Sequence, residues 1–319
     1  MSNKPLISIV IPSYNHGHLI ARAIKSVLAQ TYSNWEAIIV DNHSTDQTQE
    51  VISRFKDNRI KFIEINNDGI IALSRNKGIK IAEGQWIAFL DSDDWWSPSK
   101  LQATIDHALQ ENADLVYHNL KIARKHKQKL FPRTIHSNYL QAPVYESLVK
   151  SGNIIPNSSV LIRKSILDKV DGISEDKSKV TWEDYDCWLR VAKVSNSFSY
   201  LNSNLGFYWL GGDNTSNPNR TLKNLSSIYR LYLLDSKISL PFWFTYSLGT
   251  ALMQCGHYRD GINVFSKTII KNESWRNRLK YLIRYIQSFM GVFFSDQPYS
   301  DINKFNFMKD DLIDQNDQR

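Results

Sequence analysis

The segment Trp86-Ile-Ala-Phe-Leu-Asp91-Ser-Asp93-Asp94 passes from apolar residues directly into three carboxylates within four positions. Two unit charges about 4 Å apart repel by roughly 4 kcal/mol at an effective dielectric constant of about 20. A buried strand that ends in such a cluster therefore needs a positive partner. Oxygen-only ligands suit Mg²⁺ or Mn²⁺, which often keep positions for water and substrate phosphates. The segment predicts a metal-assisted site for a phosphorylated ligand at the carboxyl end of a strand.

An isolated Asp-x-Asp pair is weak evidence, because aspartate is common and also favours solvated turns and helix caps. Asp184-Tyr-Asp186 is a second match in this chain, and we do not interpret it as a metal site. The surrounding pattern has to decide between a metal site and a turn.

Apolar runs of strand length alternate with segments of helical periodicity through the first third of the chain. Strands are predicted at residues 6–11, 35–40, 59–65, 86–90 and 114–117, and helices at 18–30, 46–56, 70–82 and 98–110. This alternation predicts βαβ units, hence an α/β fold with a mainly parallel central sheet. Such sheets bind ligands outside the carboxyl ends of their strands. Polar loops follow the strands there, at residues 12–15, 41–46 and 91–94.

Two common phosphate-binding motifs do not occur in the sequence. The first strand–helix turn of a dinucleotide-binding domain needs a glycine-rich loop. Here that turn reads Pro12-Ser-Tyr-Asn-His-Gly17 and holds a single glycine, and the chain has no Walker A pattern. The sequence therefore argues against both a dinucleotide-binding domain and a P-loop nucleotidase.

The middle of the chain, about residues 120–215, is irregular in pattern. Residues 118–129 are basic and polar and are expected to form a solvated loop, and residues 152–162 are expected to be a loop that leads into a strand. A helix is expected to start near residue 181, with Thr181 as its cap. Glu183 and Asp184 in its first turn either only complement the helix dipole or form a catalytic carboxylate pair, and the pattern leaves both open.

From about residue 220 the pattern becomes helical, with predicted helices at 220–236, 242–256 and 258–270. Residues 274–294 combine basic side chains with an apolar and aromatic face. They either lie in a membrane interface or pack on the domain with a solvent-exposed basic face. We therefore expect a catalytic domain at 1–219 (a nucleotide-binding half, 1–118, and an acceptor half, 119–219), a helical region at 220–297 and a loose tail at 298–319.

The bulk composition limits the class of protein. The 319 residues are 42% hydrophobic and 12% aromatic, which is typical of a globular chain, and the net charge of +7 favours anionic partners. Cys187 and Cys255 are far apart and predict reduced thiols. The first residues show no signal-peptide pattern, and no apolar run reaches 18 residues. These features predict a cytoplasmic location.

Five motifs occur in one order along the chain. They are residues 10–15 (Val-Ile-Pro-Ser-Tyr-Asn), 40–46 (Val-Asp-Asn-His-Ser-Thr-Asp), 74–78 (Ser-Arg-Asn-Lys-Gly), 89–94 (Phe-Leu-Asp-Ser-Asp-Asp) and 182–190 (Trp-Glu-Asp-Tyr-Asp-Cys-Trp-Leu-Arg). Together they resemble family 2 inverting glycosyltransferases of the GT-A fold, of the bacterial polysaccharide and lipid-linked oligosaccharide type. The resemblance covers about residues 5–215.

The resemblance implies a nucleotide-binding side of the site. Pro12, Tyr14 and Asn15 would line the nucleoside pocket, and Asp41 would accept a hydrogen bond from the base, usually uracil. Asp46, in the same loop, is expected to cap the next helix. The remaining implied nucleotide-binding residues are Arg75, facing the nucleotide or diphosphate, Asn76, ordering that loop, Asp91, near the ribose, and Ser92.

The resemblance also implies a metal and a base. Asp93 would ligate Mn²⁺ or Mg²⁺ with Asp94 as a helper, while Asp184 would be the general base and Glu183 its neighbour on the acceptor side. One departure concerns a third metal ligand: residues 206–216 lack the histidine that many members carry, with Asp213 as a candidate replacement. A second departure is Asn42, which stands where many members have a second aspartate.

The implied reaction is the single-displacement transfer of a sugar from a UDP-sugar to a hydroxyl of a glycan or lipid-linked acceptor. Residues 274–294 would hold the enzyme at the inner face of the membrane. A nucleotidyltransferase also uses metal carboxylates on an α/β sheet, although it needs a basic glycine-rich loop. The positive charge and the basic aromatic helices also suit a nucleic-acid-binding protein, although no nucleic-acid motif is present.

Overall fold

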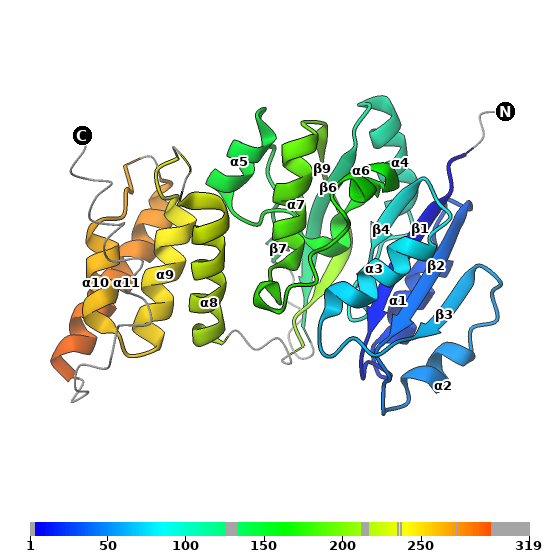
Figure 1. Ribbon diagram of the computed structural model, residues 1–319, viewed down its shortest axis with the longest axis horizontal. Coiled ribbons are helices and arrows are strands. Elements are labelled where there is room, and N and C mark those ends of the chain that lie inside the picture. The colour runs from blue at the N-terminus through cyan, green and yellow to red at the C-terminus, as the bar shows by residue number, and fades with distance from the viewer. Residues whose placement is uncertain are drawn as a thin grey trace. The chain divides into compact units, whose positions relative to one another are not determined.

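The computed structural model describes residues 4–124, 133–211, 217–234, 236, 238–271 and 273–294. The chain divides into two compact units, residues 1–215 and 216–319. The first unit is an α/β domain, and the second is built from helices (Figure 1).

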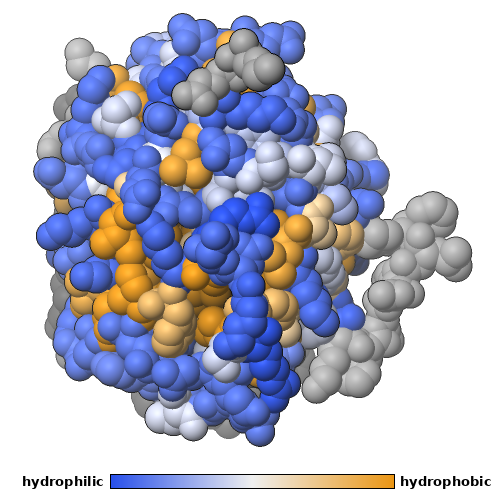
Figure 2. Space-filling model, turned by 90° about the vertical axis from the view of Figure 1, so that its right-hand side faces the viewer, coloured by the Kyte–Doolittle hydropathy of each residue, from blue (hydrophilic) through white to orange (hydrophobic). Residues whose placement is uncertain are grey.

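Four parallel strands form the first half of the sheet: β3 (Ile60–Glu64), β2 (Trp35–Asp41), β1 (Ile7–Ser13) and β4 (Trp86–Phe89) lie side by side in that order. Every residue of β1, β2 and β4 is buried, which explains their near-continuous apolar sequences. The predicted α/β fold and mainly parallel pairing are confirmed for this half. Figure 2 looks onto the side where β3 lies, and hydrophobic residues gather across the middle of that face.

The second half of the sheet is mixed. β8 (Leu161–Arg163) pairs antiparallel with β4, and β6 (Leu115–Ala123) pairs antiparallel with β8. The long strand β9 (Phe198–Trp209) then runs parallel to β6 and pairs antiparallel with β5 (Trp95–Trp96), while β7 (Thr134–Ile135) pairs with β6. Because β8 reverses direction beside β4, the carboxyl end of β4 opens toward residues from both halves of the domain.

Helices cover the sheet and connect its strands. They are α1 (Ile20–Leu28), α2 (Thr48–Ser53), α3 (Ile71–Ile81), α4 (Lys100–Gln110), α5 (Val144–Ser151), α6 (Lys164–Lys169) and α7 (Glu183–Val194), with short 3₁₀ turns at Asn157–Ser159 and Lys177–Lys179. The helices predicted from periodicity are confirmed, although α2 is shorter than residues 46–56. Among the described helices of both units, none is long and apolar enough to cross a membrane.

Two expectations for the middle of the chain are wrong. Residues 118–123 continue strand β6, and His118 and Asn119 are buried, so they are not a solvated loop; residues 125–129 lie outside the described residues. Thr181 does not cap α7, because the N-cap is Trp182 and it makes no side-chain capping bond. Thr181 instead has a positive φ of 82° and donates its N–H to Glu183 Oε2 at 2.7 Å.

The second unit contains α8 (Pro218–Ile228), continued by a π-helical turn (Tyr229–Leu233), then α9 (Phe242–Gln254), α10 (Tyr258–Ser266) and α11 (Trp275–Phe294). These elements match the four predicted helical segments. Helices α9 and α10 pack on each other, and α11 packs on α10. Phe265 of α10 is fully buried at the centre of these contacts.

Candidate active site

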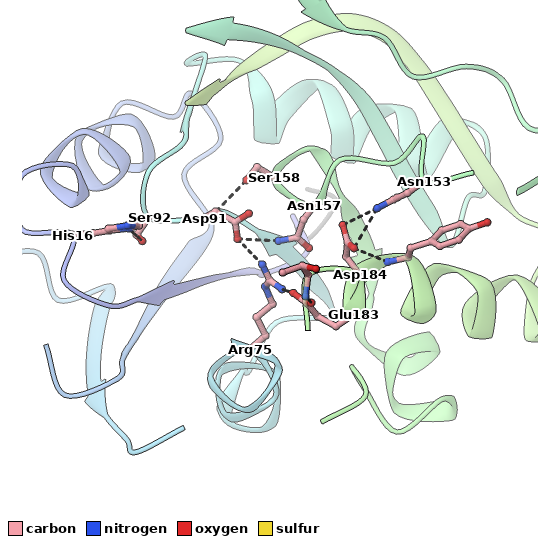
Figure 3. A network of polar contacts seen from close by, with 11 residues as sticks. His16, Arg75, Asp91, Ser92, Asn153, Asn157, Ser158, Glu183 and Asp184 are labelled. Atoms are coloured by element: carbon pink, nitrogen blue, oxygen red, sulfur yellow. Dashed lines mark hydrogen bonds and ion pairs between the residues drawn. The ribbon is translucent and has the colours of Figure 1, made fainter. Parts of the chain in front are cut away.

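Arg75 lies at the centre of a network that joins the two halves of the sheet (Figure 3). Its Nη2 donates to Asp91 Oδ1 at 2.8 Å, and its Nη1 donates to Glu183 Oε1 at 2.7 Å. Arg75 is 4% exposed. Burial alone would lower the pKa of Arg75, but the charges of Asp91 and Glu183 outweigh this and raise it. Arg75 is therefore a permanent cation that fixes both carboxylates.

The fold brings these residues together through close packing. Gly78 of α3 lies against Val10 of β1 so closely that an added Cβ would stand 2.5 Å from Val10 Cγ1. This close approach holds the preceding turn of α3, with Arg75, against the sheet. On the other side, Trp188 of α7 contacts Phe89 of β4, with ring centroids 6.1 Å apart. That contact fixes the first turn of α7 beside the carboxyl end of β4.

Asp184 follows Glu183 in the first turn of α7. Asn153 orients it, because Asn153 Nδ2 lies 3.2 Å from both carboxylate oxygens. The backbone N–H of Tyr185 also donates to Asp184 Oδ1 at 2.7 Å. Desolvation by the surrounding protein, followed by repulsion from Glu183, raises the pKa of Asp184 to about 6. Asp184 is thus an oriented carboxylate that titrates close to neutral pH, which suits a general base.

Transfer is expected to depend on the ionisation of Asp184. A base acts in its deprotonated form, so the rate should be full above the pKa and fall about tenfold for each pH unit below it. With a pKa of about 6 for Asp184 in the free protein, kcat/KM should halve near that pH. A profile of kcat/KM measured between pH 4.5 and 8 tests this; a value that stays flat down to about pH 5 would remove Asp184 as the titrating base.

The loop after β4 carries more negative than positive charge. Asp94 accepts the backbone N–H of Trp209 at 2.8 Å. Arg22 donates to the Asp93 carbonyl at 2.7 Å, and its guanidinium lies 3.7 Å from the Trp95 ring centroid. Across the site, Arg22 and Arg75 interact with five carboxyl groups: Asp91, Asp93, Asp94, Glu183 and Asp184.

Burial and this excess of negative charge raise the pKa values of two aspartates in the loop. Burial and the charge of Asp91 raise the pKa of Asp93 to about 6. Burial and the charges of Asp93 and Asp91 raise the pKa of Asp94 as well. Within the described ranges, no three His, Cys, Asp or Glu side chains converge as a complete metal cage. The donors that are present are carboxylate oxygens, the type that Mg²⁺ and Mn²⁺ prefer.

The loops after β1 and β2 hold each other in place. Ser44 Oγ accepts the N–H of Asn15 at 2.8 Å, and Asn15 Oδ1 accepts the N–H of Thr45 at 2.8 Å. Asp41 is fully buried and accepts hydrogen bonds from the Ser44 N–H and Oγ, both at 2.7 Å. Pro12 is buried in β1, whereas Tyr14 is 54% exposed. The two loops thus form one unit at the carboxyl ends of adjacent strands.

Three further predicted residues make hydrogen bonds within the protein. Asp46 accepts the N–H of Gly17 at 3.0 Å and of Thr48 at 2.9 Å, so it joins two loops at the start of α2. The Asn76 amide bonds to both the N–H and the carbonyl of Ile173. Ser92 contacts the His16 ring at 2.7 Å between Oγ and Nδ1 (Figure 3). Asp213 lies outside the described residues.

Several contacting residues were missed by the sequence analysis. Asn157 donates to Asp91 Oδ1 at 3.1 Å, and Ser158 Oγ accepts the Asp91 N–H at 3.1 Å. These residues, with Asn153, come from the polar segment 152–159, which was expected only to lead into a strand. The run of Asn and Ser there was a usable signal, but its pairing with Asp91 depends on the antiparallel β4–β8 contact. The sequence did not indicate that Arg22 belongs to the site, because an arginine within a predicted helix is common.

Some known proteins are similar to this chain in sequence, and others are similar to it in fold. The sequence is 35% identical over 193 residues to WfgD of Escherichia coli, a UDP-Glc:alpha-D-GlcNAc-diphosphoundecaprenol beta-1,3-glucosyltransferase, covering 60% of this chain and 71% of that protein. The structure of Staphylococcus aureus TarS 1-349 with UDP-GlcNAc aligns with a TM-score of 0.57 at 16% identity, covering 88% of this chain and 81% of that one.

A second solved structure shares the fold. The mannosyltransferase PcManGT from Pyrobaculum calidifontis, in complex with GDP-Man and Mn²⁺, aligns with a TM-score of 0.56 at 14% identity, covering 93% of this chain and 89% of that one. These two structures confirm the GT-A fold, and the sequence similarity to WfgD favours a glycosyltransferase over a nucleotidyltransferase. The family description "Glycosyl transferase family 2" matches residues 8–171. The chain belongs to glycosyl transferase family 2.

Proposed function

We propose that the protein transfers a sugar, with inversion, from a UDP-sugar to a hydroxyl group of a lipid-linked glycan in the synthesis of a bacterial surface polysaccharide. The observation that carries this proposal is the Arg75 bridge between Asp91 and Glu183. It joins the loop after β4 to the first turn of α7, so that Asp184 shares one site with Asp91 and Asp93. A donor side and a base therefore meet in one place.

The joined loops after β1 and β2 are the candidate nucleoside pocket. Tyr14 is exposed beside Asn15, which gives a base a ring to lie against. Asp41, which is fully buried, supports this pocket from beneath by fixing Ser44 through two hydrogen bonds. The choice of UDP is supported by the name of WfgD, which uses UDP-Glc.

The loop after β4 fits a divalent cation. Its donors are carboxylate oxygens, and its negative charge exceeds the positive charge of Arg22. One or two carboxylates with phosphate oxygens are a usual set of ligands for Mg²⁺ or Mn²⁺. We propose Asp93 as the protein ligand, with Asp94 supporting it through its bond to Trp209. When bound, such an ion offsets the charge that develops on a departing diphosphate.

Asp184 supplies the proton acceptor in this proposal. The acceptor hydroxyl must lose its proton as it attacks the anomeric carbon, and an oriented carboxylate accepts it in the same step. A single displacement inverts the anomeric configuration and needs no covalent nucleophile. Glu183, fixed by Arg75 and by the Thr181 N–H, holds the first turn of α7 and thereby the direction in which Asp184 points.

The acceptor proposal draws on WfgD, whose named acceptor carries a diphosphoundecaprenol lipid. A lipid-linked acceptor brings the reaction to a membrane surface. We propose that residues 274–294 contact the cytoplasmic leaflet of this membrane.

Thermal unfolding with nucleotides tests the donor site. UDP, GDP, CMP and ADP are added separately, each with and without Mn²⁺. A ligand at about 100 times its Kd raises the free energy of unfolding by about 2.7 kcal/mol, which corresponds to a shift of a few degrees. We expect a Mn²⁺-dependent shift with UDP only. The absence of a shift with every nucleotide would contradict the donor pocket, and a shift with GDP alone would contradict the choice of UDP.

Asp93→Asn is expected to remove the Mn²⁺-dependent part of the UDP shift, because an amide is a weaker cation ligand than a carboxylate. The effect should be at least about tenfold in UDP affinity, or about 1.4 kcal/mol. Isothermal titration of UDP with and without Mn²⁺ measures it. Asp106→Asn, an exposed aspartate of α4, is the control for the loss of one charge. If Asp93→Asn responds to Mn²⁺ like the wild type, the metal ligand lies elsewhere.

A further inference from the structure

Helix α11 exposes a continuous row of large apolar side chains, which we name the α11 stripe. Its members are between 42% and 70% exposed: Trp275, Leu279, Leu282, Ile283, Ile286, Phe289 and Met290. They recur at intervals of three and four residues, so they lie along one side of the helix. A single exposed leucine is ordinary on a protein surface, but a contiguous row of this length marks an interaction site.

The other side of α11 is firmly packed within its own unit. Tyr281 is buried and donates its hydroxyl to the Phe265 carbonyl at 2.7 Å. Gly291 approaches α10 so closely that an added Cβ would stand 2.2 Å from the Tyr258 ring. Ser288, between them, has no exposed surface. The contacts with α10 thus fix the rotation of α11 about its axis. The stripe faces outward because the opposite side of the helix packs against α10.

Basic side chains border the stripe on the helix. At 100° per residue, Arg276 and Lys280 fall on one flank of the stripe and Arg278 on the other, and Arg284 lies next to the packed side. Residues 274–294 contain four cations and no Asp or Glu. Arg278 donates to the Glu273 carbonyl, and Arg284 donates to the Gln287 amide oxygen, so these bonds leave their positive charge unneutralised.

We propose that the α11 stripe is a docking surface for an anionic lipid bilayer, on which the helix lies parallel to the membrane plane. An apolar row bordered by Lys and Arg inserts between acyl chains while its cations meet lipid phosphates. The helix is not apolar enough to span. A second copy of the stripe is a poor partner, because pairing would bring the three flanking cations of one copy, Arg276, Arg278 and Lys280, against those of the other. This inference extends the proposed acceptor side to a defined surface and lipid chemistry.

Vesicle co-sedimentation of the full chain tests this surface. The vesicles are phosphatidylcholine alone and phosphatidylcholine mixed with phosphatidylglycerol. We expect binding to the mixed vesicles, at least about tenfold weaker partition to neutral ones, and weakening by salt, because headgroup attraction is screened. The double variant Leu282→Glu/Ile286→Glu should bind mixed vesicles at least about tenfold more weakly than the wild type, because it places charge within the stripe.

A matched control separates the stripe from a general effect of added charge. Leu109→Glu/Val194→Glu adds the same two charges at apolar positions of the first unit that are 53% and 47% exposed, and it should bind like the wild type. Equal binding of the two double variants, or no binding by the wild type, overturns the proposal. A concentration-dependent dimer that Leu282→Glu/Ile286→Glu abolishes overturns it in favour of self-association.

The measurement does not depend on turnover or on nucleotide binding. A UDP-dependent melting shift that persists in a protein without vesicle binding would overturn the docking surface alone. Vesicle binding without any nucleotide shift would instead overturn the donor site and leave the docking surface standing. Since the stripe residues are exposed, the variants are expected to fold, and their melting curves verify this directly.

Discussion

Asp184→Asn is expected to lower the rate of sugar transfer by about 10²–10⁴-fold, the usual contribution of a general base. The amide has nearly the same shape as the carboxylate but cannot accept a proton at neutral pH. The contacts that orient Asp184, from Asn153 and from the Tyr185 N–H, do not reach the loops after β1 and β2. Nucleotide affinity should therefore remain within about twofold of the wild type, well under the 1.4 kcal/mol of a tenfold change.

Single-turnover kinetics with a UDP-sugar, together with UDP titration, separate these two effects. Asp168→Asn is the matched control, because Asp168 belongs to the same unit and only pairs with Lys164 at the surface; it should transfer at the wild-type rate. Near-normal turnover in Asp184→Asn would show that another group takes the proton. A large loss of UDP affinity would instead show that Asp184 supports the donor site.

The two halves of the catalytic domain were predictable to different degrees. Strands such as β1 and β2 are buried on both faces, so their apolar runs identify them without reference to neighbours. The helices between them are amphipathic, and their periodicity is local. The order of the polar loops along the chain therefore already indicated which strand ends would carry the site. The family match over residues 8–171 includes these loops, and their role in the site stays a prediction.

The second half resisted prediction because its elements depend on partners. Most residues of strand β9 (Phe198–Trp209) are only half buried, so its sequence lacks a continuous apolar run. It forms a strand because β6 and β5 pair with it. His118 looked like the start of a basic loop, yet it is buried in β6, where burial, and then the nearby charge of Lys100, lowers its pKa to about 3. Asn153 and Asn157 joined the site for the same reason, through contacts between segments that are distant in sequence.

Arg75→Met is expected to damage stability and function together. Methionine keeps much of the apolar stem but leaves two carboxylates without their cation. Removing one partner of a buried ion pair typically costs about 3–5 kcal/mol. The side chain of Glu183 is 9% exposed and that of Asp91 is 26% exposed, so most of the loss should come from Glu183, while water screens Asp91 in part. Displacement of either carboxylate also disrupts the proposed donor and acceptor sides, so transfer should fall below detection.

The pH dependence of this loss identifies its cause. Without Arg75, the carboxylate of Glu183 is buried without a cation, so its ionised form destabilises the folded variant. The deficit relative to the wild type should then be largest at neutral pH and shrink in acid, because the carboxyl group is protonated in both the folded and the unfolded state at low pH. Urea unfolding at several pH values measures this trend.

A surface pair provides the comparison for Arg75. Arg54 pairs with Glu50 one turn away on α2, and both side chains are more than 60% exposed. Arg54→Met should therefore change the free energy of unfolding by no more than about 0.5 kcal/mol. If Arg75→Met costs as little, or if its deficit does not vary with pH, the bridge does not hold the site together. If the deficit is large and pH-dependent, Arg75 is the group that makes the end of β4 and the start of α7 a single site.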